Sequence, residues 1–489
     1  MARAIMLQGT GSDVGKTLLT AGLCRVARRR GLNVRPFKPQ NMSNNAAVAV
    51  IPGSTEAGEI GRAQWLQALA CGIEPSVDMN PVLLKPQSDT GSQIIVAGKV
   101  AGSAAARDYQ AMKGGLLDAV LQSFGRLKQE ADLVIVEGAG SAAEINLREG
   151  DIANMGFATA GRVPVVLVGD INRGGVIASL VGTHAILPET DRDMVCGYLI
   201  NKFRGDVSLF DNGLEAITGH TGWRSFGVVP YLQEARTLPP EDSVVLEELS
   251  GRGGGDIKVA VPVLSRIANF DDLDPLRAEP SVNLLFIRPG ERVPSDATLV
   301  VIPGSKSTIA DIKAFRENGW DDDLRRVRQA GGYIAGLCGG YQMLGNMVRD
   351  PDCIEGEDRE IAGLGLLDIE TVMEPEKTVR NTSARSIRFD AAVEGYEIHL
   401  GLTTGPDCSR PVLRMGDRVD GAVSEDSKVW GTYLHGIFGA DDFRHQLLES
   451  LGASGPMVRY RQSVETALDR IADTLERTVD CQAIFDAAA

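Results

Sequence analysis

Long apolar runs, paired cysteines and clusters of basic residues are all missing from this sequence of 489 residues. No window approaches the roughly 18 consecutive apolar residues that a membrane-spanning helix needs, so we predict no membrane partner. The seven cysteines form no C-x-x-C pair and have no histidine at metal-ligand spacing, which indicates a reducing compartment and no zinc site. A strand-like pattern begins almost directly after Met1 and leaves no room for a secretory signal, so we predict a cytoplasmic protein.

Positive charge is also in short supply. The chain has 65 acidic residues against 50 basic ones, a formal net charge of −15. Because binding to nucleic acid depends on clustered Lys and Arg that displace counterions, this balance argues against a nucleic-acid partner. The one basic clump, RVARRRG ending at Gly31, falls at the end of a predicted helix, where it complements the helix dipole.

Short apolar strands alternate with helical patterns over the first half of the chain. A helix is predicted from Lys16 to about Arg30, after the first strand. The predicted strands are AIMLQGT, NVRPFKP, DLVIVEGAG, VPVVLVGDI, CGYLINKF and SFGVVP. Fully apolar strands separated by helices are typical of a parallel sheet covered on both faces, so this half is predicted to be a doubly wound α/β domain.

The alternation restarts after the glycine-rich sequence GRGGGD, residues 251–256, which is the best candidate for a linker. The strands predicted beyond it are IKVAVPVL, VNLLFIRPG, ATLVVIPG, GYIAGLCGG, LGLLDIE and VWGTYLHGIF. We therefore predict an α/β fold with two doubly wound domains, residues 1–250 and 257–450, and a helical tail over residues 451–489. The amphipathic pattern from Gly455 onward indicates that this tail packs on one of the domains.

A phosphate-binding loop is predicted at GTGSDVGKT, residues 9–17, because the sequence follows a strand and opens a helix. Backbone N–H groups of such a loop point at phosphates, Lys16 can neutralise their oxygens, and Thr17 can hold Mg²⁺. The spacing departs from the common G-x-x-x-x-G-K-[ST], since position 10 is Thr and the first glycine stands one residue earlier. The ATP-binding residues predicted in this loop are Thr10, Gly11, Asp13, Gly15, Lys16 and Thr17.

Polar side chains follow other predicted strands of the same half. Glu137 ends DLVIVEGAG, where a carboxylate can meet the metal, and Lys38 follows NVRPF, where it can approach a phosphate or a substrate carboxylate. Many amides and carboxylates at further loop ends favour a large ligand that forms hydrogen bonds. The candidates for this ligand and for an acyl-phosphate site are Lys38, Gln40, Asn41, Ser43, Asn44, Asn45, Glu59, Arg62, Gln64, Asp151, Asp170 and Arg173.

The second half places Cys338 at a predicted strand-to-helix turn, in GGYIAGLCGGYQMLG. The positive end of a helix favours a thiolate there, and the N–H groups of Gly339 and its neighbour can receive an oxyanion. Gly304, in PGSKST after another strand, offers a further oxyanion donor. His435 ends a short predicted strand in GTYLHGIF and can take the thiol proton, so we predict a nucleophilic cysteine with a histidine base.

Two resemblances carry these motifs further. GTGSDVGKT and VEGAG are similar to the loops of dethiobiotin synthetase and its relatives, which are P-loop NTPases; this implies ATP, with Asn201 and Lys202 of LINKF near the nucleotide base. GLCGGYQMLG and GTYLHG resemble class I glutamine amidotransferase domains, which have a flavodoxin-like sheet and release ammonia from glutamine through a thioester. This implies that Gln342 contacts bound glutamine.

The amidotransferase resemblance leaves one gap. Many such domains continue the histidine strand as His-x-Glu, but residue 437 is Ile in this sequence. Either a Cys–His dyad suffices or another carboxylate orients His435.

An ATP domain of this kind followed by such an amidotransferase domain resembles the corrinoid-amidating enzymes of cobalamin synthesis, over nearly the entire chain. FKPQNMSNN, EIGRAQ, NPVLLKPQSDTGSQ, GDINRGG and EGYEIHLGLT look like the cobyric acid synthase family, and the acidic FK-x-G-P-D stretch expected of a,c-diamide synthases is absent. The resemblance implies amidation of the b, d, e and g carboxylates of adenosylcobyrinic acid a,c-diamide, with ATP, Mg²⁺ and glutamine. The candidates for binding this polyanion are then Lys38, Arg62, Lys85 and Arg173.

Two other functions stay open. One is a related ligase that amidates another carboxylate, such as a cobyrinic acid a,c-diamide synthase or a cell-wall precursor amidase. The other is a regulatory nucleotide switch whose C-terminal domain only binds a partner. The order of the amidations, the path of ammonia and the oligomeric state, a homodimer included, are also open.

Overall fold

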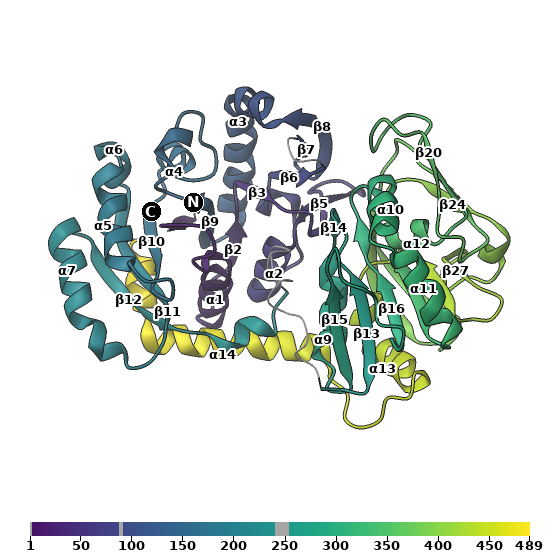
Figure 1. Ribbon diagram of the computed structural model, residues 1–489. Coiled ribbons are helices and arrows are strands. Elements are labelled where there is room, and N and C mark those ends of the chain that lie inside the picture. The colour runs from purple at the N-terminus through teal and green to yellow at the C-terminus, as the bar shows by residue number, and fades with distance from the viewer. Residues whose placement is uncertain (1, 88–90, 240–253) are drawn as a thin grey trace. The chain divides into compact units, whose positions relative to one another are not determined.

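The computed structural model describes residues 2–87, 91–239 and 254–489 (Figure 1), so residues 251–253 of the predicted linker lie outside the described residues. The backbone forms two compact units. The first contains Met1–Ser43, Ala49–Glu241 and Val464–Ala489, and the second contains Asn44–Val48 and Asp242–Ser463. Neither unit is therefore one continuous stretch of the sequence.

The first unit is built on a six-stranded sheet in the order β12-β11-β10-β1-β9-β2, in which all neighbouring strands are parallel. Its strands are β1 (Arg3–Gly9), β2 (Val34–Phe37), β9 (Leu133–Ser141), β10 (Val165–Asp170), β11 (Val195–Phe203) and β12 (Arg224–Pro230). All of β1 except Arg3 is buried, as expected for a central strand with apolar side chains on both faces. The six strands predicted for the first half, and their parallel sheet, are confirmed.

Helices pack on this sheet. The predicted helix α1 (Lys16–Arg29) contacts β1, β2 and β9, and α5 (Val176–Ile186) packs on β10. The other helices are α2 (Arg62–Cys71), α3 (Ala106–Glu130), α4 (Met155–Gly161), α6 (Glu189–Arg192) and α7 (Asp211–Thr221). A smaller sheet has the order β3-β6-β7-β8, with β3 (Gln40–Met42), β6 (Val82–Pro86), β7 (Gly91–Val96) and β8 (Lys99–Ala105). The short strands β4 (Ala46–Val50) and β5 (Ala57–Gly61) follow β3.

The C-terminal tail forms α14 (Tyr460–Thr478) and α15 (Cys481–Asp486). The tail joins the first unit from Val464 onward. Arg25 of α1 forms an ion pair with Glu465 of α14. Ala4 of β1 and Ala489 exchange backbone hydrogen bonds of 2.8 and 3.1 Å, so the last residue is fixed to the central strand of the sheet.

The second unit has its own six-stranded sheet, in the order β15-β13-β16-β18-β28-β27, which is parallel except for the edge pair β27 and β28. Its strands are β13 (Ile257–Pro262), β15 (Val282–Ile287), β16 (Leu299–Ile302), β18 (Tyr333–Leu337), β27 (Ala422–Val423) and β28 (Val429–Thr432). Its helices are α9 (Asp274–Ala278), α10 (Thr308–Glu317), α11 (Trp320–Gln329), α12 (Gly339–Met343) and α13 (Asp441–Ser450). With the first sheet, this confirms the predicted α/β class with two doubly wound domains.

Two antiparallel or mixed sheets and one short strand pair complete the second unit. They contain β14 (Ile267–Ala268), β17 (Gly304–Ser305), β19 (Met347–Arg349), β20 (Glu360–Ala362), β21 (Glu370–Val372), β22 (Thr378–Ser386), β23 (Ala392–His399), β24 (Leu402–Thr404), β25 (Leu413–Met415) and β26 (Arg418–Asp420).

The strand predicted at LGLLDIE is wrong, because residues 364–369 form a bent segment and β21 begins only at Glu370. Leu366 and Leu367 donate backbone hydrogen bonds to Leu344, so the apolar side chains of this segment pack at the end of α12.

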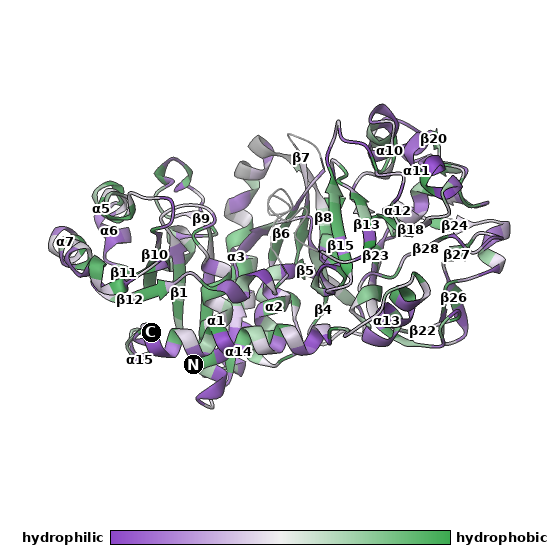
Figure 2. Cartoon of the chain, turned by 60° about the horizontal axis from the view of Figure 1, so that its bottom comes forward, coloured by the Kyte–Doolittle hydropathy of each residue, from purple (hydrophilic) through white to green (hydrophobic). Residues whose placement is uncertain are grey.

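Hydropathy follows the layers of each unit. In Figure 2 the strands β1 and β13 carry hydrophobic colour, whereas α11 is largely hydrophilic. Within the part of the chain that the structure describes, no helix combines the length and the apolar character that crossing a membrane requires.

Candidate active sites at the carboxyl edges of two sheets

The loop between β1 and α1 is held in shape by its own unit. Gly15 has φ 94°, and a side chain there would collide with the Asn201 amide, so only glycine fits. Lys16 Nζ donates hydrogen bonds to the carbonyl oxygens of Gly140, at 2.7 Å, and Gly11, at 3.4 Å. The lysine thus lies folded over the loop and bound to backbone carbonyl groups.

Asn201 and Lys202, at the end of β11, also contact this loop. Asn201 Nδ2 donates to the Val14 carbonyl oxygen at 2.8 Å, and Lys202 Nζ donates to the Asp13 carbonyl oxygen. Lys202 forms a second contact of 2.9 Å with Asp170 Oδ2. That these two residues lie near a nucleotide base stays a prediction from the resemblance; in this structure their side chains contact the phosphate loop.

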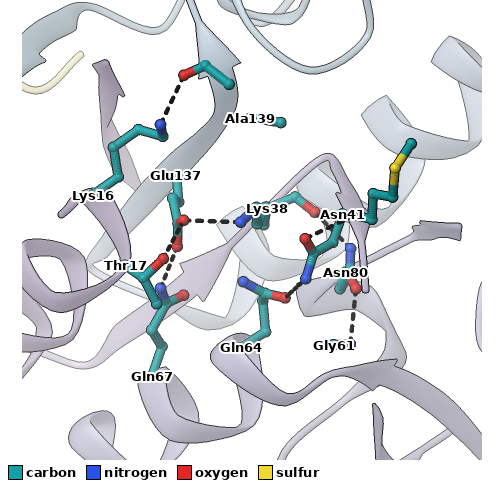
Figure 3. A network of polar contacts seen from close by, with 12 residues as sticks. Lys16, Thr17, Lys38, Asn41, Gly61, Gln64, Gln67, Asn80, Glu137 and Ala139 are labelled. Atoms are coloured by element: carbon teal, nitrogen blue, oxygen red, sulfur yellow. Dashed lines mark hydrogen bonds and ion pairs between the residues drawn. The ribbon is translucent and has the colours of Figure 1, made fainter. Parts of the chain in front are cut away.

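Glu137 is the centre of a buried polar network (Figure 3); it lies in the middle of β9, which continues to Ser141 instead of ending at Glu137 as predicted. Its carboxylate accepts hydrogen bonds from Thr17 Oγ1 at 2.7 Å, Lys38 Nζ at 2.9 Å and Gln67 Nε2 at 2.5 Å. A hydroxyl and a carboxylate at this separation are hard oxygen ligands of the kind Mg²⁺ takes, together with water and substrate phosphates. The donor set around Thr17 and Glu137 therefore fits a magnesium ion.

Further amide side chains, of which Asn41 and Gln64 were predicted, lie beside Glu137 (Figure 3). Asn41 Nδ2 donates to Gln64 Oε1 at 3.1 Å. Asn80 Nδ2 donates to the backbone oxygen of Lys38 at 3.1 Å, which fixes the segment carrying that lysine. Lys85 and Glu59 form a fully buried ion pair of 2.8 Å.

The remaining candidates of this half lie in several places. Gln40 accepts a hydrogen bond from Tyr109, and Asp151 caps the start of α4. Asp170 accepts hydrogen bonds from Lys202 and from the Asn172 backbone. Arg173 contacts Asp13 at 3.4 Å, and the Arg62 guanidinium stacks over the Trp65 ring. Ser43 belongs to the first unit, whereas Asn44 and Asn45 group with the second. The structure therefore brings together Lys16, Thr17, Lys38 and Glu137, but it does not gather the whole predicted set.

Sequence reasoning missed Gln67 and Asn80 in this network. A signal for Gln67 existed, because RAQWLQ places two glutamines three residues apart, on one face of a helix. Asn80 follows no periodic pattern and gave no such signal.

Cys338 stands on a sharp turn between β18 and α12. Its φ of 51° and ψ of −110° are unusual for a side chain with a Cβ atom, and such strain concentrates at functional sites. A Cβ atom at Gly339 would lie 2.8 Å from the Ser305 backbone nitrogen, and one at Gly340 would collide with the Ile302 carbonyl oxygen. Both glycines therefore permit the close approach that the turn needs, and Cys338 remains 7% exposed.

His435 lies beside this cysteine. The predicted strand ends at Thr432, three residues earlier than expected, and His435 then pairs with Tyr396 through two backbone hydrogen bonds of 3.1 and 2.9 Å. Burial lowers the pKa of His435, but the Asp272 carboxylate and the Cys338 side chain raise it, with a net rise to about 10. The imidazole is thus held as a cation at neutral pH.

Asp272 is the carboxylate that the sequence left open. Its Oδ2 lies 2.7 Å from His435 Nδ1, and its Oδ1 accepts the Gly436 backbone N–H at 2.6 Å. The residue lies on the short 3-10 helix η6 (Phe270–Leu273) and is buried. It stands 163 positions before the histidine, among several neighbouring acidic residues, so the sequence gave no way to select it.

Gln342 is anchored at both ends of its amide. Thr308 Oγ1 donates to its Oε1 at 2.9 Å, and its Nε2 donates to the Leu400 carbonyl oxygen at 2.8 Å and to the Tyr433 hydroxyl at 3.2 Å. His399 stacks on Tyr433 with ring centroids 3.8 Å apart. Burial lowers the pKa of His399 to about 4, so this second histidine is neutral.

Gly304 lies close to His435, since a Cβ atom there would be 3.1 Å from His435 Cε1. The structure thus brings together all five residues predicted for this half, Cys338, His435, Gly304, Gly339 and Gln342, and adds Asp272.

Fold and sites define a P-loop nucleotide-binding domain joined to a glutamine amidotransferase domain. The model of the CobQ/CobB/MinD/ParA nucleotide-binding domain matches residues 5–245, and that of the CobB/CobQ-like glutamine amidotransferase domain matches residues 258–443.

Full-length relatives narrow the class. A cobyric acid synthase of Mesorhizobium japonicum is 69% identical over 100% of both chains. The cobyric acid synthase of Sinorhizobium fredii is 67% identical over 98% of both chains. That of Brucella suis biovar 1 is 64% identical over 99% of both chains. The chain belongs to the cobyric acid synthase family.

Proposed function

We propose that this enzyme amidates the b, d, e and g carboxylates of adenosylcobyrinic acid a,c-diamide to give adenosylcobyric acid, using one ATP and one glutamine for each amide. The observation that carries the proposal is the buried array of Cys338, His435 and Asp272, in a chain that shares its full length with cobyric acid synthases. A regulatory nucleotide switch would have no use for a strained cysteine beside a charged histidine.

Ammonia is released in the second unit. In the reactive pair the proton rests on His435, which Asp272 orients and keeps charged, and the Cys338 thiolate attacks the carbonyl carbon of the glutamine side-chain amide. Backbone N–H groups of Gly339 and the Gly304 segment receive the oxyanion. His435 returns its proton to the leaving ammonia, and water then hydrolyses the glutamyl thioester.

The carboxylate is activated in the first unit. An ionised carboxylate does not react with ammonia because its oxygen is a poor leaving group, so the γ-phosphate of ATP is first transferred to it. Lys16 and the N–H groups of the loop between β1 and α1 bind the phosphates, and Lys38 draws the carboxylate towards them. Thr17 and Glu137 would hold a magnesium ion, which would supply charge stabilisation to the phosphoryl group when bound. Ammonia displaces phosphate from the acyl phosphate.

We also propose that the enzyme is located in the cytoplasm. Seven free cysteines and the need for a reduced nucleophile favour the cytoplasm. A homodimer remains a prediction.

The decisive experiment is mass spectrometry of the corrinoid products formed by the purified enzyme with ATP and glutamine. Four successive conversions of carboxyl to amide, starting from the a,c-diamide, are expected. Conversion of cobyrinic acid at the a and c positions, or amidation of a cell-wall precursor with the corrinoid left unchanged, would instead identify one of the related ligases.

A further inference from the structure

Two buried glutamines on α2 face the reaction region with unsatisfied groups. Gln64 and Gln67 are both 0% exposed. Gln64 Nε2 and Gln67 Oε1 have no hydrogen-bond partner among the residues that the structure describes. A polar group that is buried without a partner destabilises the folded protein, so we expect these two groups to be filled when the substrates bind.

The network fixes which atom of each amide is left over. The Glu137 carboxylate can only accept hydrogen bonds, so Gln67 must turn its NH₂ group to it and its carbonyl oxygen away. Asn41 Oδ1 accepts the backbone N–H of Met42, so the Asn41 NH₂ group must donate to Gln64 Oε1. The unused groups are therefore a donor on Gln64 and an acceptor on Gln67, and an amide flip at either residue would break an existing bond.

These two groups belong to one location. The residues lie three positions apart on α2 and so share a face of the helix. In Figure 3 the Gln64 nitrogen and the Gln67 oxygen point toward one another, beside the contact between Lys38 and Glu137. A ligand that fills both must accept one hydrogen bond and donate another.

We propose that Gln64 and Gln67 bind the tetrahedral adduct that forms when ammonia attacks the phosphorylated carboxyl group. This inference rests on the proposed function. In that adduct one carbon carries an oxyanion and an ammonium group, which are the acceptor and the donor that the two amides require. Gln64 donates to the oxyanion, and Gln67 accepts an N–H bond from the attacking nitrogen.

The step balances in atoms and charge. The nitrogen lone pair forms the C–N bond while the carbonyl π electrons move to the oxygen that Gln64 contacts. The carbonyl group then reforms, and the bond between the carbon and the phosphate oxygen breaks. The leaving phosphate keeps the electron pair of that bond and takes one proton from the nitrogen. The products are one carboxamide and hydrogen phosphate. The adduct has stronger charges than the acyl phosphate, so the two amides stabilise it more than the ground state.

The test separates acyl-phosphate formation from its capture by ammonia. Acyl-phosphate formation is followed without ammonia, by scrambling of an oxygen isotope between the bridging and non-bridging positions of labelled ATP in the presence of the corrinoid. Capture is followed as kcat/KM for amidation with ammonium chloride. The variants are Gln64→Met, Gln67→Met and, as a matched control, Gln122→Met at an exposed position of α3.

In Gln64→Met we expect the ammonium-dependent kcat/KM to fall about 10²-fold, the usual effect of losing one transition-state hydrogen bond, with isotope scrambling within twofold of the parent. In Gln67→Met, which also loses the hydrogen bond to Glu137, we expect amidation to fall at least tenfold more than scrambling. Gln122→Met should match the parent in both assays. Gln64 is the cleaner variant because it does not contact Glu137.

An equal loss of scrambling and amidation in both variants would overturn the inference and make the glutamines mere supports of the Glu137 network. Unchanged amidation would overturn it as well. If the parent enzyme itself formed no amide with ammonium, the proposed function would fail, an outcome distinct from either of these.

Discussion

The two candidate sites both lie near the carboxyl ends of parallel strands, but the side chains in them have different kinds of partner. In the second unit the reacting groups already contact one another: His435 is bonded to Asp272, and Cys338 is fixed on its turn beside it. In the first unit the corresponding groups are occupied by the protein, because Lys16 is bonded to backbone oxygens and Glu137 to three donors.

The difference follows from the chemistry. A covalent nucleophile must be activated before its substrate arrives, and this requires fixed short distances. Phosphoryl transfer is mostly charge stabilisation, so we expect the lysines and the carboxylate of the first unit to exchange their protein partners for phosphate and metal when the ligands bind. The second site is therefore expected to hydrolyse glutamine by itself, whereas the first depends on what binds to it.

Cys338→Ala should produce the largest effect and isolate the two sites. We expect glutamine-dependent amidation to fall about 10⁶-fold, as for the loss of other covalent nucleophiles. Amidation with ammonium chloride should stay within twofold of the parent. Both activities are measured by chromatography of the corrinoid products, and a parallel loss with ammonium would show that the cysteine also serves the first site.

Lys16→Ala should impair the first site and leave glutamine hydrolysis in the second unit unchanged. Removing the cation that reaches the phosphates should lower amidation about 10³-fold with either nitrogen source. Glutamate release from glutamine without ATP should not change, because Lys16 lies in the other unit. Loss of glutamine hydrolysis in this variant would contradict the independence of the second site.

Asp272→Asn should change the pH dependence of glutamine hydrolysis. With its pKa raised to about 10, His435 stays protonated below that pH and loses its charge as the pH rises through it. Without the carboxylate, burial pulls the pKa of His435 down. The alkaline limb of the kcat/KM profile for glutamine hydrolysis should move by at least one pH unit to the acid side, and the rate at pH 8 should fall about 10²-fold.

The control for this variant is Asp271→Asn, at the neighbouring buried aspartate. We expect its alkaline limb to coincide with that of the parent. Identical profiles for Asp272→Asn and the parent would mean that Cys338 and His435 suffice as a dyad.

Arg444→Ala should change activity least while it weakens the scaffold of the second site. Arg444 and Glu279 are both 0% exposed and form an ion pair of 2.7 Å that anchors α13. Removing one partner of a buried pair typically costs about 3–5 kcal/mol. Chemical denaturation should show this loss, with kcat at 25 °C near the parent value in the folded fraction; an unchanged unfolding midpoint would refute it.

The parts of the protein that follow local patterns were predictable. Apolar strands such as DLVIVEGAG and the loop ending at Lys16 have signatures that depend on adjacent residues, and so does the turn at Cys338. LGLLDIE misled because Leu367 is buried, and Leu364 and Leu366 partly buried, by packing in the hydrophobic core of the second unit and not by strand pairing; burial alone does not distinguish the two.

The carboxylate that orients His435 could not be predicted, because pairing across 163 residues depends on the finished fold. The same holds for the roles of Asn201 and Lys202. Their strand could be located, but the contacts of their side chains with the phosphate loop appear only in three dimensions.

The discontinuous make-up of the first unit has a consequence for biosynthesis. Its sheet contains β1, near the start of the sequence, but α14 and Ala489, which pairs with β1, come after the second unit in the sequence. During synthesis, all residues of the second unit are therefore made before the segment that completes the first unit. A chain that ends directly before Val464 is therefore expected to contain every residue of the second unit but to lack part of the first.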